Sequence, residues 1–342
     1  MTVALFPPSN YADAMRTITL EEHCSLPAFL RAVDAHSQRD LTANEYMQKV
    51  RTKLTDLGQV RLADMDAAGI DLQVPSLAGG DLDHLDAATA ASFARDANDA
   101  MADAVRAHPT RFAAFAALSL QDPGAAALEL ERCIRQHRFV GVMVNGAVDG
   151  HFLDHPRFTP FWEAAHALEI PVYLHPAPPP TPVYQSYFTG LPEVLGFMLS
   201  TAGWGWHVET GMHVLRLIVT GLFDRFPRLQ LIIGHMGEDL PYSLARANSV
   251  LSRAGHKLSR SVAEIFHQHV HITTSGYFTV PPFLCALQVV GADRILFSID
   301  YPFSPTEVGR RFLDSLPINP ADLHKIAHGN AERLLKLPTA VS

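Results

Sequence analysis

Residues 230–235 read QLIIGH and residues 294–300 read RILFSID, and in each stretch a run of apolar residues stops at an ionisable side chain. The stretches TITLEEH at residues 17–23 and PVYLH at residues 171–175 have the same form. Short apolar runs bounded by turn residues are typical of strands buried in a parallel sheet. These four stretches predict such a sheet, with His, Glu and Asp side chains gathered at the ends of its strands.

The same kind of run recurs eight times along the chain. The predicted strands are Thr17–Glu21, Ile70–Leu77, Phe112–Leu118, Gly141–Asn145, Pro171–His175, Gln230–His235, His271–Ser275 and Arg294–Asp300. Helical patterns lie between them: apolar residues recur every four positions in Leu85–His108, and Glu209–Phe226 ends at a Phe-Pro pair that stops a helix. Eight alternations predict an α/β fold of the (β/α)8 or TIM barrel type, because crossover helices then cover a sheet without edges.

The chain is expected to form one domain over residues 1–342, because no Gly/Ser linker divides it. Within that domain we interpret residues 1–16 as an N-terminal arm and residues 24–60 as an insertion after the first strand, near the barrel mouth. The segment HPAPPPTP, from His175 to Pro182, is interpreted either as a rigid surface loop or as a pocket wall.

Composition narrows the functional classes. Of the 342 residues, 48% are hydrophobic and 18% are charged, and the net charge is −8. A negative net charge argues against a nucleic-acid partner, and no apolar stretch is long enough to predict a membrane span. The three cysteines form no CxxC pair and the N-terminus lacks the pattern of a secretory signal, so a cytoplasmic protein is expected.

Four residues at predicted strand ends form a candidate metal site. Glu21 and His23 lie two positions apart, so they face the same side of a strand, whereas Glu22 faces the other. Catalytic groups of a barrel lie at the carboxyl-terminal strand ends, which places His175 and Asp300 on the same rim. The mixed nitrogen and oxygen set suits zinc and also manganese. Any one of these residues could have a purely structural role. Four such residues are not expected to meet on one rim by chance.

His235 is a further imidazole at the rim, in the turn GHMGE. It is interpreted as an acid–base group whose ring is oriented by Glu238, with direct metal ligation and a purely structural turn as the alternatives. Other histidines, among them His207, are taken as structural. Trp204 and Trp206 are expected either to pack in the core, to line an aromatic pocket or to pack between subunits.

Several motifs together resemble one branch of the amidohydrolase superfamily (amidohydrolase 2), named for aminocarboxymuconate semialdehyde decarboxylase. The motifs are TLEEHC, RLADMDAAGID, VYLHP, HVLRLIVTGLFDRFPRLQLIIGHMGE, HITTSG, DRILFSIDYPF and GNAERLLKL, and they span nearly the whole chain. The EEH form of the first strand looks most like γ-resorcylate (2,6-dihydroxybenzoate) and 2,3-dihydroxybenzoate decarboxylases.

The resemblance implies roles for particular residues. Glu21, His175 and Asp300 would bind the metal, with His23 as an additional ligand in some members. The resemblance also implies that Arg246 contacts substrate, in some members across a subunit interface, and that the protein forms a homodimer or homotetramer. Phe303 would be a substrate-binding residue like that of the dihydroxybenzoate enzymes.

The resemblance further implies one divalent ion (Zn²⁺ or Mn²⁺) per subunit, since the fourth strand ends in Asn145 and offers no lysine that could be carbamylated to bridge two ions. Two positions depart from the usual pattern: Cys24 stands where a Phe is common, and Tyr301 where a Trp is common. These departures bear on the identity of the substrate.

The expected activity is non-oxidative decarboxylation of an ortho-hydroxylated aromatic acid, a lyase reaction of aromatic compound catabolism. Asp300 would protonate the ring, assisted by His235 and Glu238. The alternative is a hydrolase that uses the same mononuclear site to open a lactone or amide. A binding scaffold without activity is the third hypothesis, and it is disfavoured because every expected ligand is present.

Overall fold

The computed structural model describes residues 15–36, 45–78, 82, 85–253 and 258–339, and within them all eight predicted strands are present. The strands are β1 (Ile18–Cys24), β2 (Leu72–Leu77), β3 (Phe115–Ala117), β4 (Gly141–Asn145), β5 (Val172–His175), β6 (Leu231–Ile233), β7 (Val270–Thr273) and β8 (Ile295–Leu296). Every pairing between them is parallel.

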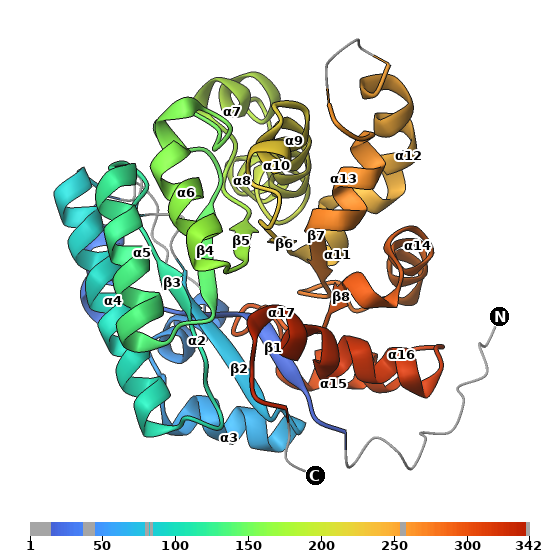
Figure 1. Ribbon diagram of the computed structural model, residues 1–342. Coiled ribbons are helices and arrows are strands. Elements are labelled where there is room, and N and C mark those ends of the chain that lie inside the picture. Colours follow the sequence, from blue (N-terminus) through green and yellow to red (C-terminus); the bar gives the residue numbers. More distant parts are fainter. Residues whose placement is uncertain (1–14, 37–44, 79–81, 83–84, 254–257, 340–342) are drawn as a thin grey trace.

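Helices connect successive strands and surround them on the outside (Figure 1). Between β1 and β5 they are α1 (Pro27–His36), α2 (Glu45–Leu54), α3 (Gln59–Ala68), α4 (Ala87–Ala107), α5 (Pro123–His137) and α6 (Thr159–Leu168). Between β5 and β8 they are α7 (Thr181–Tyr187), α8 (Glu193–Ser200), α9 (Gly205–Val219), α10 (Leu222–Arg225), α11 (His235–Glu238), α12 (Leu240–Leu251), α13 (Val262–His269) and α14 (Val280–Val290). After β8 come α15 (Thr306–Asp314), α16 (Pro320–His324) and α17 (Asn330–Leu335).

The strands follow the order of a (β/α)8 barrel. The strands form two hydrogen-bonded groups. One group pairs β1 with β2, and the other pairs β3, β4, β5, β6, β7 and β8 in that order. A single bridge between Gln73 and Phe112 connects the two groups. At the other side, the His23 N–H donates to the Tyr301 carbonyl at 2.6 Å, which brings the first strand against the segment that follows β8.

The last strand is much shorter than the predicted Arg294–Asp300, because side chains take over its hydrogen bonds. The Ser298 N–H donates to Thr274 Oγ1 at 3.0 Å, and the same hydroxyl donates to the Ser298 carbonyl at 2.9 Å. On the β1 side, the Glu22 carboxylate accepts from the Ile299 N–H at 3.0 Å and from the Tyr301 N–H at 3.3 Å. The seam between β8 and β1 is therefore held by side chains where a ladder was expected.

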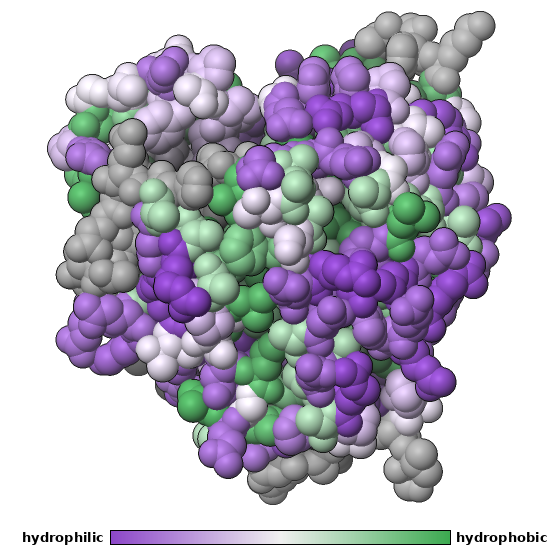
Figure 2. Space-filling model, turned by 90° about the vertical axis from the view of Figure 1, so that its left-hand side faces the viewer, coloured by the Kyte–Doolittle hydropathy of each residue, from purple (hydrophilic) through white to green (hydrophobic). Residues whose placement is uncertain are grey.

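Two apolar clusters build the core. One fills the space between the strands, with Ile18, Leu20, Phe115 and Ile232 among its buried members. The other lies between strands and helices; α4, for example, buries Ala90, Ala94, Ala97 and Met101 at helical spacing. Hydrophilic side chains cover most of the outer face viewed in Figure 2, and hydrophobic ones show in the furrows between them.

The proposed insertion begins with α1 and α2, while its residues 37–44 and residues 1–14 of the predicted N-terminal arm lie outside the described part of the chain. The Tyr46 hydroxyl of α2 donates to the Phe303 carbonyl at 2.7 Å, so this helix reaches the segment after β8. None of the described helices is long and apolar enough to cross a membrane.

We predict that Glu22→Ala lowers the free energy of unfolding by about 2–4 kcal/mol, because two buried N–H groups lose their acceptor. Urea unfolding of the metal-loaded protein measures this loss. Glu22→Gln keeps one acceptor oxygen and should lose less. Glu45→Ala, on the exposed side of α2, should change little. A loss for Glu22→Ala no larger than that of Glu45→Ala would contradict this account of the seam.

Candidate metal and active site

An irregularity in β1 turns the site residues toward the barrel interior. Ile18 pairs with Leu72 and Thr19 with Gln73, but the next pair is Glu22 with Pro75, so β1 contains one extra residue. Bulges of this kind re-aim side chains next to active sites. Ile18 and Leu20 face the interior cluster below the bulge, and Glu21 and His23 face the site above it.

The Glu21 carboxylate is fully buried and is held by two hydroxyl groups. The Tyr173 hydroxyl donates to Glu21 Oε2, and the Thr273 hydroxyl donates to the same oxygen at 3.4 Å. Gly234, directly after β6, lies so close that an added Cβ would be 2.6 Å from Glu21 Oε2 and 3.1 Å from the Tyr173 hydroxyl. A glycine is required at this position because its backbone approaches the carboxylate.

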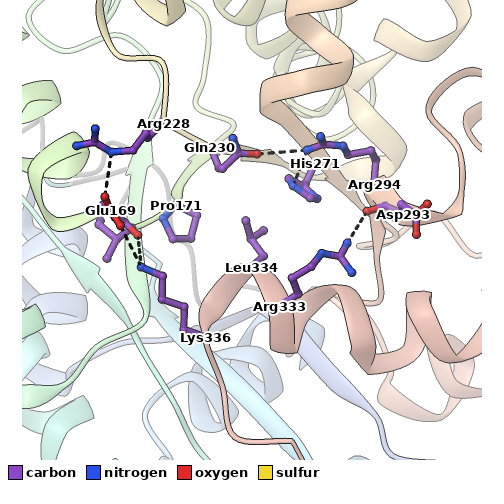
Figure 3. Close-up of a pocket in the computed structure, with 11 residues that line it drawn as sticks. Glu169, Pro171, Arg228, Gln230, His271, Asp293, Arg294, Arg333, Leu334 and Lys336 are labelled. Atoms are coloured by element: carbon purple, nitrogen blue, oxygen red, sulfur yellow. Dashed lines mark hydrogen bonds and ion pairs between the residues drawn. The ribbon is translucent and has the colours of Figure 1, made fainter.

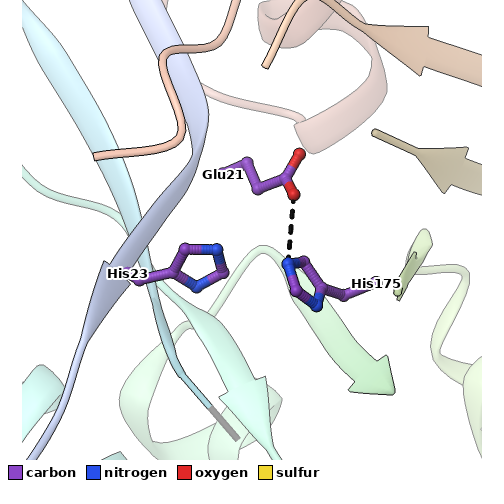
Figure 4. Close-up of side chains that lie close together, drawn as sticks. All are labelled: Glu21, His23 and His175. Atoms are coloured by element: carbon purple, nitrogen blue, oxygen red, sulfur yellow. Dashed lines mark ion pairs between the residues drawn. The ribbon is translucent and has the colours of Figure 1, made fainter. Parts of the chain in front are cut away.

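Imidazole and carboxylate groups converge on the other oxygen of Glu21. His175 Nε2 lies 3.2 Å and His235 Nε2 3.6 Å from Glu21 Oε1. His23 Nε2 lies 3.4 Å from Asp300 Oδ1, and His235 Nε2 lies 4.0 Å from Asp300 Oδ2. Figure 4 shows Glu21 and His23 projecting from β1, and His175 from β5, into one space. The structure thus brings together all four residues predicted as metal ligands.

The geometry of Glu21 Oε1 fits a bound cation. This oxygen is buried and has no hydrogen-bond partner among the described residues. His175 Nδ1 faces two acceptors, Asn145 Oδ1 at 3.0 Å and the Pro176 carbonyl at 2.8 Å, so it carries the ring proton. In the neutral ring, the lone pair on Nε2 therefore faces Glu21. Two electron-rich atoms that face each other at 3.2 Å are stabilised by a metal ion between them.

Two overlapping groups of possible ligand atoms describe this centre. Glu21, His23 and His175 form one group, and Glu21, His235 and Asp300 form the other; within each group the ligand atoms lie within 4.8 Å of one another. Because both groups share Glu21, the arrangement can hold one divalent ion. Nitrogen and carboxylate ligands of this kind suit zinc and manganese.

A strained turn fixes His235. The five consecutive residues from His235 to Asp239 all have positive φ, between 48° and 90°. Left-handed backbone is costly for residues other than glycine and is concentrated at functional sites. The turn allows Glu238 to accept from His235 Nδ1 at 2.8 Å, and His207 Nδ1 binds the other carboxylate oxygen at 2.7 Å. His207, which the sequence suggested was only structural, is thus part of a His235–Glu238–His207 chain.

The buried charges shift one another's protonation. Burial raises the pKa of Asp300 to about 7, aided by the negative charge of Glu21 and opposed by His235 and His175. Burial disfavours protonated His235, but attraction to Glu21 and Glu238 outweighs it and raises the pKa of His235 to about 10. Burial also opposes ionisation of Glu21, yet the surrounding histidines hold its pKa well below the usual range. Without a cation, the centre therefore contains an ionised Glu21 beside a protonated His235.

His23 is much less basic than His235. Burial lowers its pKa to about 4, against the attraction of Glu21, so the ring is neutral and able to act as a metal ligand. Its Nδ1 lies 3.5 Å from the Ser76 hydroxyl, and its ring makes an edge contact with Phe303 at a centroid distance of 5.6 Å. Phe303, predicted to bind substrate, therefore lies beside the cluster.

Arg246 and Trp206, for which the sequence suggested other roles, differ in their position relative to the cluster. Arg246 is exposed on α12, and among the described residues it forms no hydrogen bond or ion pair with the cluster. Trp206, whose role was left open, lies with its ring centroid 6.4 Å from that of His175, and its buried Nε1 lacks a hydrogen-bond partner among the described residues. Sequence reasoning also missed Tyr173, although its spacing of two from His175 on one strand was a usable signal.

The comparison with known families identifies the family of the chain: the family model described as amidohydrolase matches residues 33–337. The chain belongs to the amidohydrolase family. Its curated relatives include a gamma-resorcylate decarboxylase of Rhizobium radiobacter, 38% identical over 94% of this chain and 98% of the relative.

Solved structures of decarboxylases are also similar to this chain in fold and sequence. A 2,6-dihydroxybenzoate decarboxylase complexed with 2,6-dihydroxybenzoate has a TM-score of 0.85 and 36% identity, covering 94% of this chain and 99% of the other. A dihydroxybenzoic acid decarboxylase from Polaromonas sp., with bound manganese and the inhibitor 2-nitroresorcinol, has a TM-score of 0.86 and 35% identity, covering 95% and 98%. These neighbours are (β/α)8 barrels of the amidohydrolase type, in agreement with the predicted fold.

We predict that Gly234→Ala weakens metal binding at least about tenfold, because the added methyl group displaces the Glu21 carboxylate. The φ of Gly234 is −80°, which alanine can adopt, so the contact alone is tested. Metal analysis after dialysis measures the effect. Gly124→Ala is the matched control, because its new Cβ meets nothing closer than 3.4 Å. Equal metal content in the two variants would refute the proposed role of Gly234.

Proposed function

We propose that the protein is a metal-dependent, non-oxidative decarboxylase of an aromatic carboxylic acid with a hydroxyl group ortho to its carboxylate. The observation that carries this proposal is the similarity to gamma-resorcylate decarboxylases along 94% of the chain. The relatives favour this reaction over the alternative, hydrolysis of a lactone or amide at the same centre. The substrate would resemble a dihydroxybenzoate.

The proposed metal ligands are Glu21, His23, His175 and Asp300. A divalent ion held by them would act as a Lewis acid toward the carboxylate and the neighbouring phenolate oxygen of the substrate. Phe303 and Trp206 would contact the aromatic ring of the substrate, a proposal supported by their ring contacts with His23 and His175.

Asp300 is the proposed proton donor. Direct loss of CO2 would leave an aryl carbanion, so the ring carbon that carries the carboxylate must be protonated first. Asp300 gives its proton to that carbon; the carbon–carbon bond then breaks, CO2 leaves, and the bonding electrons restore the aromatic ring. In the centre without a cation, burial raises the pKa of Asp300 to about 7, whereas a bound cation favours the ionised carboxylate. A metal-bound Asp300 must take this proton from the substrate hydroxyl or from solvent.

His235 and Glu238 would support this proton transfer. His235 Nδ1 is held by Glu238, so its Nε2 is directed toward Asp300 and Glu21. A protonated His235 stabilises negative charge on Asp300 after the proton has left. Glu238 is shared with His207, which keeps the carboxylate from rotating away.

We further propose that the protein is a homodimer or homotetramer. Exposed apolar side chains lie on α8 and α9, at the residue directly before α9, and on the neighbouring α12: Val194, Leu195, Met198, Leu199, Trp204, Val208, Met212, Tyr242 and Val250. A surface of this kind is typical of an interface between protein subunits. Arg246 lies on the same exposed helix, which supports contact with the substrate of a partner subunit.

The domain organisation and the location are further parts of this proposal. We propose a single domain in which residues 24–60 cover the barrel mouth, supported by the contact of α2 with Phe303. A cytoplasmic location is supported by the free state of Cys24, Cys133 and Cys285.

We predict that Arg246→Ala costs about 2–4 kcal/mol in kcat/KM, because a substrate carboxylate loses its cationic partner. Steady-state kinetics on 2,6-dihydroxybenzoate measures the loss. Arg253→Ala, two residues beyond α12 and also exposed, is the control and should retain full activity. An unchanged kcat/KM in Arg246→Ala would remove this residue from the site.

The decisive variant for the reaction is Asp300→Asn, which keeps the side-chain volume and an oxygen near the metal but cannot carry the proton. Decarboxylation should fall by at least about 10²-fold to 10⁴-fold. Exchange of the product's ring proton with heavy water should fall with it, because the exchange needs the same group to deliver a deuteron to, and take a proton from, the same ring carbon. Proton NMR of resorcinol in heavy water measures the exchange.

The matched control is Asp103→Asn at an exposed position of α4, which should exchange the ring proton as fast as wild type. Undiminished exchange in Asp300→Asn would show that another group delivers the proton. Wild-type enzyme that hydrolyses a lactone but exchanges no ring proton in any phenol would overturn the decarboxylase proposal and favour hydrolysis.

A further inference from the structure

A second pocket lies at the amino-terminal end of the strands, the end opposite the metal ligands (Figure 3). Its volume is about 410 Å³. Pro171, Gln230 and Arg294 each line it from the position directly before β5, β6 and β8, and Arg333 and Leu334 line it from α17. The pocket shares no residue with the metal centre and has no part in the reaction proposed above.

The pocket is basic although the protein as a whole is acidic. Its lining includes four cationic side chains and two carboxylates, in a chain with a net charge of −8. The carboxylates are already neutralised: Glu169 pairs with Arg228 at 2.9 Å and with Lys336 at 3.9 Å. The other, Asp293, pairs with Lys325 at 3.0 Å.

The two remaining cations, Arg294 and Arg333, contact only neutral acceptors. Arg294 Nη1 donates to Gln230 Oε1 at 3.2 Å and to His271 Nε2 at 2.8 Å. Arg333 Nη2 donates to the Asp293 carbonyl at 3.1 Å and to Asn330 Oδ1 at 2.9 Å. Among the described residues, neither guanidinium forms an ion pair with a carboxylate. Arg333 is exposed, but Arg294 is half-buried, and a half-buried guanidinium without a counterion is unusual because charge withdrawn from water is normally paired.

His271 lies in the same lining and holds Arg294 in place. The residue is 4% exposed. Because Nε2 accepts from the guanidinium of Arg294, the ring proton of the neutral imidazole must be on Nδ1. Burial, with repulsion from Arg294 and Arg333, lowers the pKa of His271 to about 3, so the ring is neutral. Its Nδ1 is buried and has no partner among the described residues.

We propose that this pocket is a binding site for a small organic anion, such as an aromatic carboxylate. The anionic group would be held by the guanidinium groups of Arg294 and Arg333, and it would supply the counterion and the acceptor oxygens that both lack. Pro171 and Leu334 offer an apolar wall for the body of the ligand. A volume of 410 Å³ exceeds the need of a bare inorganic ion and suits a ring with one acidic substituent.

Isothermal titration calorimetry of the metal-loaded protein tests this proposal, with benzoate, acetate and inorganic phosphate as probes. Benzoate should bind more tightly than acetate, which lacks the apolar body, and more tightly than phosphate. Arg294→Gln and Arg333→Gln should each weaken this benzoate site at least about tenfold. Arg228→Gln is the matched control in the same pocket, because its charge is already paired with Glu169, and it should bind benzoate like wild type.

Benzoate can also bind at the metal centre. Binding there is recognised because wild type and all three variants should retain it, whereas binding in the basic pocket is weakened by Arg294→Gln and Arg333→Gln. Arg333 is exposed, so Arg333→Gln gives the result even if Arg294→Gln fails to fold. Benzoate binding that is the same in Arg333→Gln as in wild type would overturn the proposal. So would phosphate binding as tight as benzoate binding, which would indicate an adventitious ion only.

Discussion

The ionised carboxylate of Glu21 is buried at the carboxyl-terminal end of the strands, and the arrangement of the site depends on it. Burying a lone carboxylate is strongly unfavourable unless positive charge and hydrogen bonds compensate. Tyr173 and Thr273 compensate one oxygen, and the other is left facing His175 and His235. That unpaired oxygen is the position at which a divalent ion relieves the cost of burial, so stability and metal affinity are coupled.

The demands of this carboxylate extend into the surrounding backbone. The extra residue in β1 directs Glu21 inward, and the absence of a side chain at Gly234 leaves room for its oxygens. The left-handed turn from His235 to Asp239 then places an imidazole against the same carboxylate. On the other side of β1, Glu22 binds the N–H groups on both sides of Asp300, whose φ is 74°. The two adjacent glutamates therefore have different roles: Glu21 faces the metal centre, and Glu22 holds the segment that carries Asp300.

The sequence predicted the fold and the four converging side chains because apolar runs and strand-end positions are local patterns. It could not predict the short β8, since the hydrogen bonds that replace its ladder come from Thr274 and Glu22, which are distant in sequence. His207 was missed for a similar reason: it lies on α9, and only folding brings it to Glu238. The sequence also could not predict the basic pocket at the amino-terminal end of the strands, because its residues come from the starts of separate strands and from α17.

The central claim is that this metal centre decarboxylates an aromatic acid through its ortho hydroxyl group. The most direct measurement is CO2 release by the metal-loaded enzyme from 2,6-dihydroxybenzoate and from 3,5-dihydroxybenzoate, which lacks an ortho hydroxyl. The account predicts release from the 2,6 isomer alone, loss of release when the metal is removed, and recovery when Zn²⁺ or Mn²⁺ is returned. Equal release from both isomers, or the same release after complete metal removal, would contradict it.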